Sequence, residues 1–89
     1  MKKPFSHRAT HGFWKLYDQL PDSIQKIADE NFILLKSNPK HPSLHFKHNK
    51  DEIWSVRVGM QFRALALEEG EGFTWIWIGT HAEYDRIIR

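Results

Sequence analysis

The segment from Trp54 to Leu67, WSVRVGMQFRALAL, constrains the fold more than any other part of the chain. Apolar and polar residues alternate on both sides of Gly59, which is the periodicity of two β-strands joined by a tight turn. A two-residue loop would mix charged and apolar side chains on both faces, so we predict a three-residue loop at 59–61. The apolar face then holds Trp54, Val56, Val58, Phe62, Ala64 and Ala66.

This register has an unusual consequence for two arginines on the opposite face. Arg57 and Arg63 become direct cross-strand partners, and like charges in this position repel each other. A neighbouring carboxylate or an anionic ligand would offset the repulsion. Phosphate is the natural ligand because the guanidinium fork matches it bidentately. The alternative is a pair of solvated surface arginines, since arginine is usually exposed. The residues alone leave both interpretations open.

Length and composition narrow the class of protein. The chain has 89 residues, which predicts one small domain over 1–89. It contains no cysteine, which excludes disulfides, thiolate catalysis and cysteine-ligated zinc, and which fits a cytoplasmic location. We expect no membrane span, and the first ten residues lack the apolar core of a secretory signal. A net charge of +2 permits a polyanionic partner without requiring one.

The first forty residues predict a short edge strand or arm followed by two helices. The strand is expected near Pro4 to Arg8. Thr10 is a good N-cap, and apolar residues at i, i+3, i+4 and i+7 predict an amphipathic helix over 11–20. Pro21 ends this helix and suits the first turn of a second one. The second helix has its own apolar stripe and ends at Ser37-Asn38-Pro39.

The rest of the chain predicts strands and a last short helix. Leu44 to Lys47 alternates like a strand and is followed by a polar turn over 48–51. After the central hairpin, Phe73 to Gly79 is apolar on both faces, as in a central strand covered on both sides. Thr80 is a candidate cap for a helix from His81 to Ile88. We therefore predict an α+β fold, with the N-terminal helical hairpin packed on one face of a small antiparallel sheet.

Four segments give the sequence a resemblance to a known family. They are Leu20-Pro21, NPKHPSLHFK from Asn38 to Lys47, WSVRVGMQFRAL from Trp54 to Leu65, and WIWIGTHAEYDRI from Trp75 to Ile87. In their order and spacing they resemble the RelE/ParE superfamily of small toxins from bacterial type II toxin–antitoxin systems. The resemblance implies a compact α+β fold with an antiparallel sheet and helices on one face.

The resemblance also implies function and partners. RelE-like members cut messenger RNA in the ribosomal A site, whereas ParE-like members have a similar fold but act on DNA gyrase. Both kinds are neutralised by an antitoxin protein, and a toxin–antitoxin complex binds its operator DNA through the antitoxin. We expect this chain to be a ribosome-dependent, metal-independent messenger RNA endoribonuclease that inhibits translation. The alternatives are a gyrase inhibitor that cleaves nothing and an inactive relative.

Roles carry over from the family at matching positions. Arg57 and Arg63 match phosphate-binding basic residues on the sheet. His81 and Tyr84 resemble a histidine and a tyrosine near the C-terminus of several ribonuclease members. We expect the arginines to stabilise charge on the phosphate and His81 to transfer a proton, because histidine titrates near neutral pH. Tyr84 would stack on a base or orient the RNA. Contacts to RNA are expected from Lys47, His45 and Lys50.

Most of these residues also have a purely structural interpretation. His81 would then only help to cap the last helix after Thr80. Tyr84 would be a core aromatic with its hydroxyl at the rim. Lys47 would be an ordinary solvated lysine. Two tryptophans of the last strand, Trp75 and Trp77, are expected in the core rather than as a platform for stacking bases.

The histidines also raise the question of a metal site. His41, His45 and His48 lie close together in the sequence, and His7 and His11 are four residues apart. Zinc can use three imidazole ligands. On a strand, however, His45 and His48 would point to opposite faces, and no HExxH-like pattern is present. We therefore expect neither a metal nor another cofactor.

Overall fold

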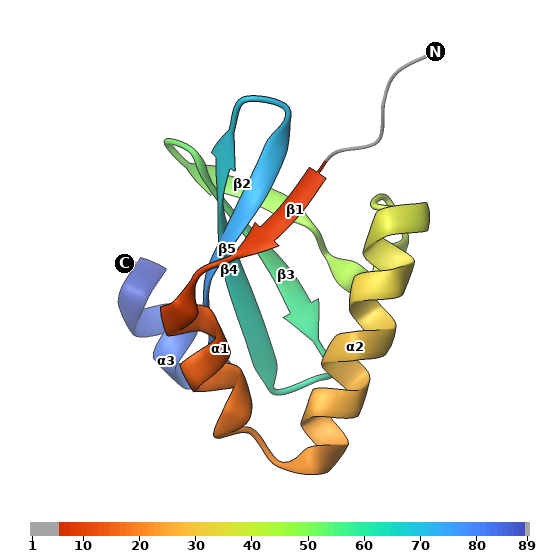
Figure 1. Ribbon diagram of the computed structural model, residues 1–89, viewed down its shortest axis with the longest axis vertical. Helices are drawn as coiled ribbons and strands as arrows, with labels where there is room; N and C mark the ends of the chain where they lie inside the picture. Colours follow the sequence, from red (N-terminus) through yellow and green to blue (C-terminus); the bar gives the residue numbers. More distant parts are fainter. Residues whose placement is uncertain (1–5, 89) are drawn as a thin grey trace.

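A five-stranded sheet forms the centre of the structure, a computed structural model that describes residues 6–88. The strands lie in the order β1-β5-β4-β3-β2. Figure 1 shows the hairpin of α1 and α2 across one face of this sheet, which confirms the α+β fold. In chain order the elements are β1 (Ser6–Ala9), α1 (His11–Asp18), α2 (Asp22–Ser37), the 3₁₀ turn η1 (Pro42–Leu44), β2 (Lys47–Lys50), β3 (Ile53–Val58), β4 (Phe62–Glu69), β5 (Gly72–Thr80) and α3 (His81–Ile88).

The central hairpin has the predicted register. Val58 pairs with Phe62 and Arg57 pairs with Arg63 around the loop at 59–61. Gly59 adopts a φ of 64°, which a residue without a Cβ reaches at little cost. The predicted apolar face packs into the core, with Val56, Val58, Ala64 and Ala66 buried and Trp54 and Phe62 partly buried. Alternation along the two strands was therefore sufficient to predict their pairing.

The sheet is antiparallel except at one edge. β1 pairs in parallel with β5, from Ser6 opposite Gly72 to Ala9 opposite Trp75. The edge strand was expected near Pro4 to Arg8. Its first residues, Pro4 and Phe5, lie outside the described part of the chain. A strand of four residues carries no local signal for the direction of its partner, so the sequence did not predict the parallel pairing.

Both N-terminal helices follow their local signals. The Thr10 hydroxyl caps α1 by accepting a hydrogen bond from the backbone N–H of Phe13 at 3.0 Å. The helix ends at Asp18 rather than at residue 20, because Gln19 and Leu20 bond to carbonyls three residues back and tighten the last turn. Pro21 directly precedes α2, as expected, and α2 ends at Ser37 before Asn38 and Pro39.

The segment between α2 and β3 differs from the prediction. A strand was expected over Leu44–Lys47, but Pro42–Leu44 form a 3₁₀ turn and β2 begins only at Lys47. Pro42 suits the first position of such a turn, and Nδ1 of His41 accepts a hydrogen bond from the backbone N–H of Ser43 at 3.2 Å. Leu44 is fully buried from this turn. The apolar alternation therefore reflected burial without a strand.

The predicted polar turn over 48–51 was also wrong. β2 continues through His48 to Lys50, paired with β3, and the turn follows at Asp51 and Glu52. Asp51 takes a φ of 51°, a conformation that aspartate tolerates better than most residues. Polar residues can form this edge strand because β3 provides the hydrogen-bond partners for its backbone.

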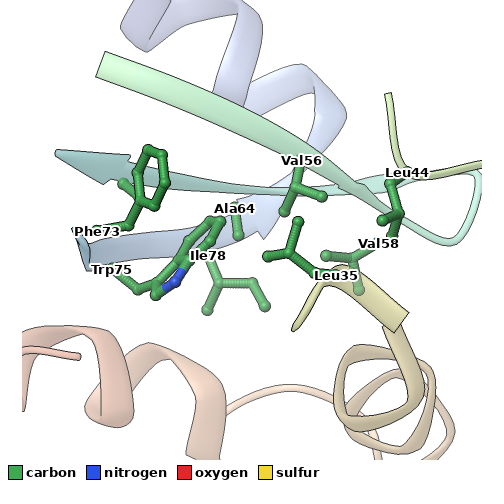
Figure 2. Packing of buried hydrophobic residues seen from close by; sticks show 9 residues of the cluster. Leu35, Leu44, Val56, Val58, Ala64, Phe73, Trp75 and Ile78 are labelled. Carbon is green, nitrogen blue, oxygen red and sulfur yellow. The ribbon is translucent and has the colours of Figure 1, made fainter. Parts of the chain in front are cut away.

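The core lies between the sheet and the helices α1 and α2. Figure 2 shows Leu35 of α2 and Leu44 meeting buried side chains of β3, β4 and β5. Trp75 is in the core, as predicted, and its indole N–H donates to Nδ1 of His7 at 3.1 Å. Trp77 lies on the other face of β5, opposite Leu65, where it is only partly buried.

The last helix has the predicted bounds and lies on the other face of the sheet from α1 and α2 (Figure 2). The Thr80 hydroxyl accepts a hydrogen bond from the backbone N–H of Glu83 at 3.2 Å, and the Glu83 carboxylate accepts one from the N–H of Thr80 at 3.0 Å. This is a capping box. The bonds to Thr80 lower the pKa of Glu83. None of the helices in the described chain has the length and hydropathy of a membrane span.

Candidate functional site

Two arginines stand opposite each other on the sheet face that α1 and α2 leave uncovered. Arg57 of β3 and Arg63 of β4 are direct cross-strand partners, and both are half-buried. Burial and the neighbouring Arg57 lower the pKa of Arg63. Both groups remain cations, because a guanidinium does not lose its proton in a protein. The predicted repulsion between the two guanidinium groups is therefore present on this face of the sheet.

The protein satisfies these guanidinium groups only in part. Nη1 of Arg63 donates to the carbonyl oxygen of Phe62 at 2.8 Å. Nε of Arg57 is buried and has no hydrogen-bond partner within residues 6–88. In the same range, neither arginine is within ion-pair distance of a carboxylate. A buried N–H without an acceptor is costly. An anion bound between the two guanidinium groups would relieve their like-charge repulsion.

His81 and Arg63 line one surface hollow of about 500 Å³. The hollow lies between the β3–β4 loop and the first turns of α3, and Met60, Gln61, Thr80 and Asp85 also line it. The backbone N–H of His81 donates to the carbonyl oxygen of Gln61 at 2.7 Å, which ties the start of the helix to the loop. This bond brings a candidate proton-transfer group next to a candidate phosphate ligand.

Asp85 is a residue of this hollow that sequence reasoning missed. Its carboxylate lies 3.2 Å from Nδ1 of His81, and both side chains are about half exposed. The signal was present in the sequence, because residues four apart on a predicted helix share one face. Asp85 also counteracts the lowering of the pKa of Arg63.

Tyr84 is buried behind the hollow. Its exposed fraction is 7%, and its ring centroid lies 5.9 Å from that of His81. The hydroxyl is 3.3 Å from Oγ of Ser55 and 3.4 Å from Oδ1 of Asn49. A base can stack only on a ring face that is free. The structure therefore favours the interpretation of Tyr84 as a core aromatic that anchors α3 to the sheet.

The predicted RNA-contacting residues lie at different distances from the arginines. Lys47 is exposed and pairs with Ser55, so it shares the face of Arg57 about 7 Å along the sheet. His45 is exposed and precedes β2 with a φ of 45°. Lys50 pairs with Ile53, roughly 13 Å from Arg57 along β3. The structure thus places Lys47 at the margin of the arginine pair and Lys50 near the opposite end of the strand.

The described residues hold no group of three or more histidine, aspartate or glutamate side chains that could bind a metal ion. The geometric argument made from the sequence was nevertheless wrong, because His45 precedes β2 and does not share a strand with His48. The ring of His48 instead packs 5.5 Å from that of Trp54, and its Nε2 contacts the carbonyl oxygen of Asp51. His48 therefore has structural neighbours of its own.

Comparison with known proteins identifies the fold. No family model and no curated protein matches the sequence. Among solved structures, a chain of the RelB–RelE antitoxin–toxin complex from Methanococcus jannaschii matches with a TM-score of 0.70 and 15% identity, over 92% of this chain and 99% of that one. YafQ from E. coli strain BL21(DE3) matches with a TM-score of 0.71 and 11% identity, over 90% of this chain and 97% of that one.

A third similar structure is the YoeB/ParE toxin from Agrobacterium tumefaciens, with a TM-score of 0.65 and 18% identity, over 86% of this chain and 99% of that one. The match extends over nearly the whole length of all three neighbours. The chain therefore has the fold of the RelE-like toxins. The fold that the resemblance implied is confirmed.

Proposed function

We propose that this protein is the toxin of a type II toxin–antitoxin system and a metal-independent, ribosome-dependent endoribonuclease of messenger RNA. The observation that supports the proposal most is the pair of opposed arginines. In a chain with the fold of RelE-like toxins, Arg57 and Arg63 face each other, and a buried N–H of Arg57 has no acceptor among residues 6–88. A phosphodiester supplies the negative charge and the acceptor oxygens that this arrangement lacks.

The residues of this face fit two of the roles that RNA cleavage needs, stabilisation of the phosphate charge and removal of a proton from the 2′-hydroxyl. Arg57 and Arg63 hold the scissile phosphate and stabilise the charge that develops on it. His81 takes the proton of the ribose 2′-hydroxyl. The 2′-oxygen forms a bond to phosphorus, the bond from phosphorus to the 5′-oxygen breaks, and the leaving oxygen takes a proton from water. Lys47 contacts a neighbouring phosphate, and Tyr84 holds α3 in place beneath His81.

The expected partner is a cognate antitoxin. The similar structures include antitoxin–toxin complexes of RelB–RelE and of DinJ–YafQ. For this chain, the antitoxin would cover the arginine face or displace α3, and it would carry the complex to operator DNA. The toxin itself would act in the cytoplasm on ribosomes engaged with messenger RNA. An antitoxin footprint confined to the outer side of α1 and α2 would contradict this docking.

The test is primer extension on messenger RNA translated in a purified system. Wild-type protein should create new 5′ ends only when ribosomes are present. Arg63→Ala should lower cleavage by about a hundredfold or more, the scale of losing one transition-state charge contact. Its free energy of unfolding should stay within about 0.5 kcal/mol of wild type, because the substitution also removes a like-charge pair. Arg8→Ala, an exposed arginine on β1, is the matched control and should cleave normally.

The gyrase alternative makes a different prediction for the same protein. A ParE-like inhibitor would produce no new 5′ ends, would leave translation unaffected and would inhibit DNA supercoiling by purified gyrase. Growing cells would then show an SOS response with filamentation rather than rapid loss of protein synthesis. That result would reject the ribonuclease and reduce the arginine pair to a contact surface for another protein.

A further inference from the structure

Asp85, which lies beside His81, is the charged residue of the hollow that the proposed roles leave unused. Nδ1 of His81 lies 3.2 Å from a carboxylate oxygen of Asp85, within the first two turns of α3. The ionised carboxylate attracts an N–H and repels a lone pair, so this contact favours the neutral tautomer that carries its hydrogen on Nδ1. In a neutral imidazole the lone pair then belongs to Nε2. Within residues 6–88, Nε2 of His81 has no hydrogen-bond partner.

The geometry points to Asp85 as a positioning residue that fixes the Nδ1–H tautomer of His81 and leaves Nε2 as the proton acceptor in the hollow. Three features of the structure agree with this assignment. Both residues line the hollow that holds Arg63. The backbone N–H of His81 is fixed by Gln61, so the imidazole starts from an anchored position. Tyr84 packs against the imidazole on the side away from solvent.

Contacts in the first turns of α3 also limit how the helix can move. The capping box of Thr80 and Glu83 fixes the first turn of α3, and the buried Tyr84 fixes the next. Asp85 follows directly after Tyr84, so its backbone has a defined position relative to His81. The orientation of the imidazole is therefore set by one flexible contact on a helix that is otherwise held at three points.

The consequence for the reaction rests on the proposed function. A neutral His81 with its hydrogen on Nδ1 can take the proton of the 2′-hydroxyl at Nε2, and the imidazolium that forms is stabilised by the Asp85 carboxylate. With the other tautomer, Nε2 carries a hydrogen and has no lone pair to offer. Removal of Asp85 would therefore lower the rate without removing any group that touches RNA.

The experiment that tests the tautomer needs no substrate. Full-length protein labelled with nitrogen-15 in histidine is studied by long-range proton–nitrogen correlation at about pH 8, above the usual histidine pKa of about 6.5. His81→Gln identifies the His81 signals among those of the six histidines. We expect the Nδ1–H tautomer in wild type and in Asp85→Glu, and the Nε2–H tautomer in Asp85→Ala. Asp18→Ala, an exposed aspartate at the end of α1, should match wild type.

A wild-type His81 in the Nε2–H form, or a tautomer that Asp85→Ala leaves unchanged, would overturn the inference. Cleavage measured on the same variants gives a separate result. We expect Asp85→Ala to lose about tenfold in rate, a part of what general base catalysis provides, with recovery in Asp85→Glu. A wild type with the Nδ1–H tautomer that cleaves nothing would reject the proposed ribonuclease while leaving the assignment of Asp85 intact.

Discussion

The two faces of the central sheet use the same strands for opposite purposes. Beneath α1 and α2, alternate residues of β3, β4 and β5 are apolar and buried. On the α3 side, the residues between them include Arg57 and Arg63, and the described part of the chain gives the buried Nε of Arg57 no hydrogen-bond partner. Because successive side chains of a strand point to opposite faces, each strand contributes to both. The difference shows that adjacent residues of one strand can serve different purposes, one in the core and the next in the candidate site.

The hollows on the two faces differ in the side chains that line them. The hollow beneath α1 and α2 has a volume of about 230 Å³ and is lined mainly by apolar side chains, among them Phe13, Leu35 and Ile78. At its rim the Tyr17 hydroxyl donates to the Asp29 carboxylate at 2.7 Å, which joins the two helices and raises the pKa of Tyr17 to about 12. The hollow beside α3 includes groups that can exchange protons or bind anions, namely Arg63, His81 and Asp85.

The largest expected effect on stability comes from the core face. Trp75→Ala should lower the free energy of unfolding by about 3–5 kcal/mol, because it leaves a cavity and removes the partner of His7. Chemical denaturation followed by circular dichroism measures the change. Ile33→Ala, which truncates an α2 side chain that is 64% exposed, is the control and should have little effect. Equal losses in both variants would mean that the core face is packed less closely than described.

An intermediate effect is expected where α3 meets the sheet. Tyr84→Phe should cost about 1 kcal/mol, because the buried Ser55 hydroxyl loses its partner while the aromatic ring stays in place. Ser55→Ala tests the coupling. If the two hydroxyls form one bond, the double variant should cost less than the sum of the two single variants. Strict additivity in denaturant unfolding would contradict the bond.

The smallest effect is a pH dependence located on the core face. Burial, and then the charge of Lys36, lower the pKa of His7, whose ring packs among Phe32, Phe73 and Trp75. The unfolded chain therefore binds a proton more readily than the folded one. His7 should contribute its full stability above about pH 6.5 and lose it as the pH falls through the lowered value.

Unfolding measured from neutral to mildly acidic pH checks this expectation. His7→Gln removes the titrating group and should show a shallower loss of stability than wild type, whereas the other histidines titrate equally in both proteins. Identical slopes would place the acid sensitivity elsewhere. Burial of His7 on the core face would then not disfavour its charged form.

The sequence by itself determined features that depend on neighbours in the chain. Alternation around Gly59 predicted the register that opposes Arg57 and Arg63. Thr10 and Thr80 predicted where two helices begin, because a side-chain cap acts within three residues. The apolar run of β5 predicted a central strand for the same local reason.

Only the tertiary structure decided what depends on residues far apart. The parallel partner of β1, the late start of β2 and the burial of Tyr84 against Ser55 all require contacts between distant segments. The spacing of His81 and Asp85 was visible in the sequence, but their place beside Arg63 was not. That placement depends on a hydrogen bond between the start of α3 and the β3–β4 loop, which forms only when the sheet is assembled.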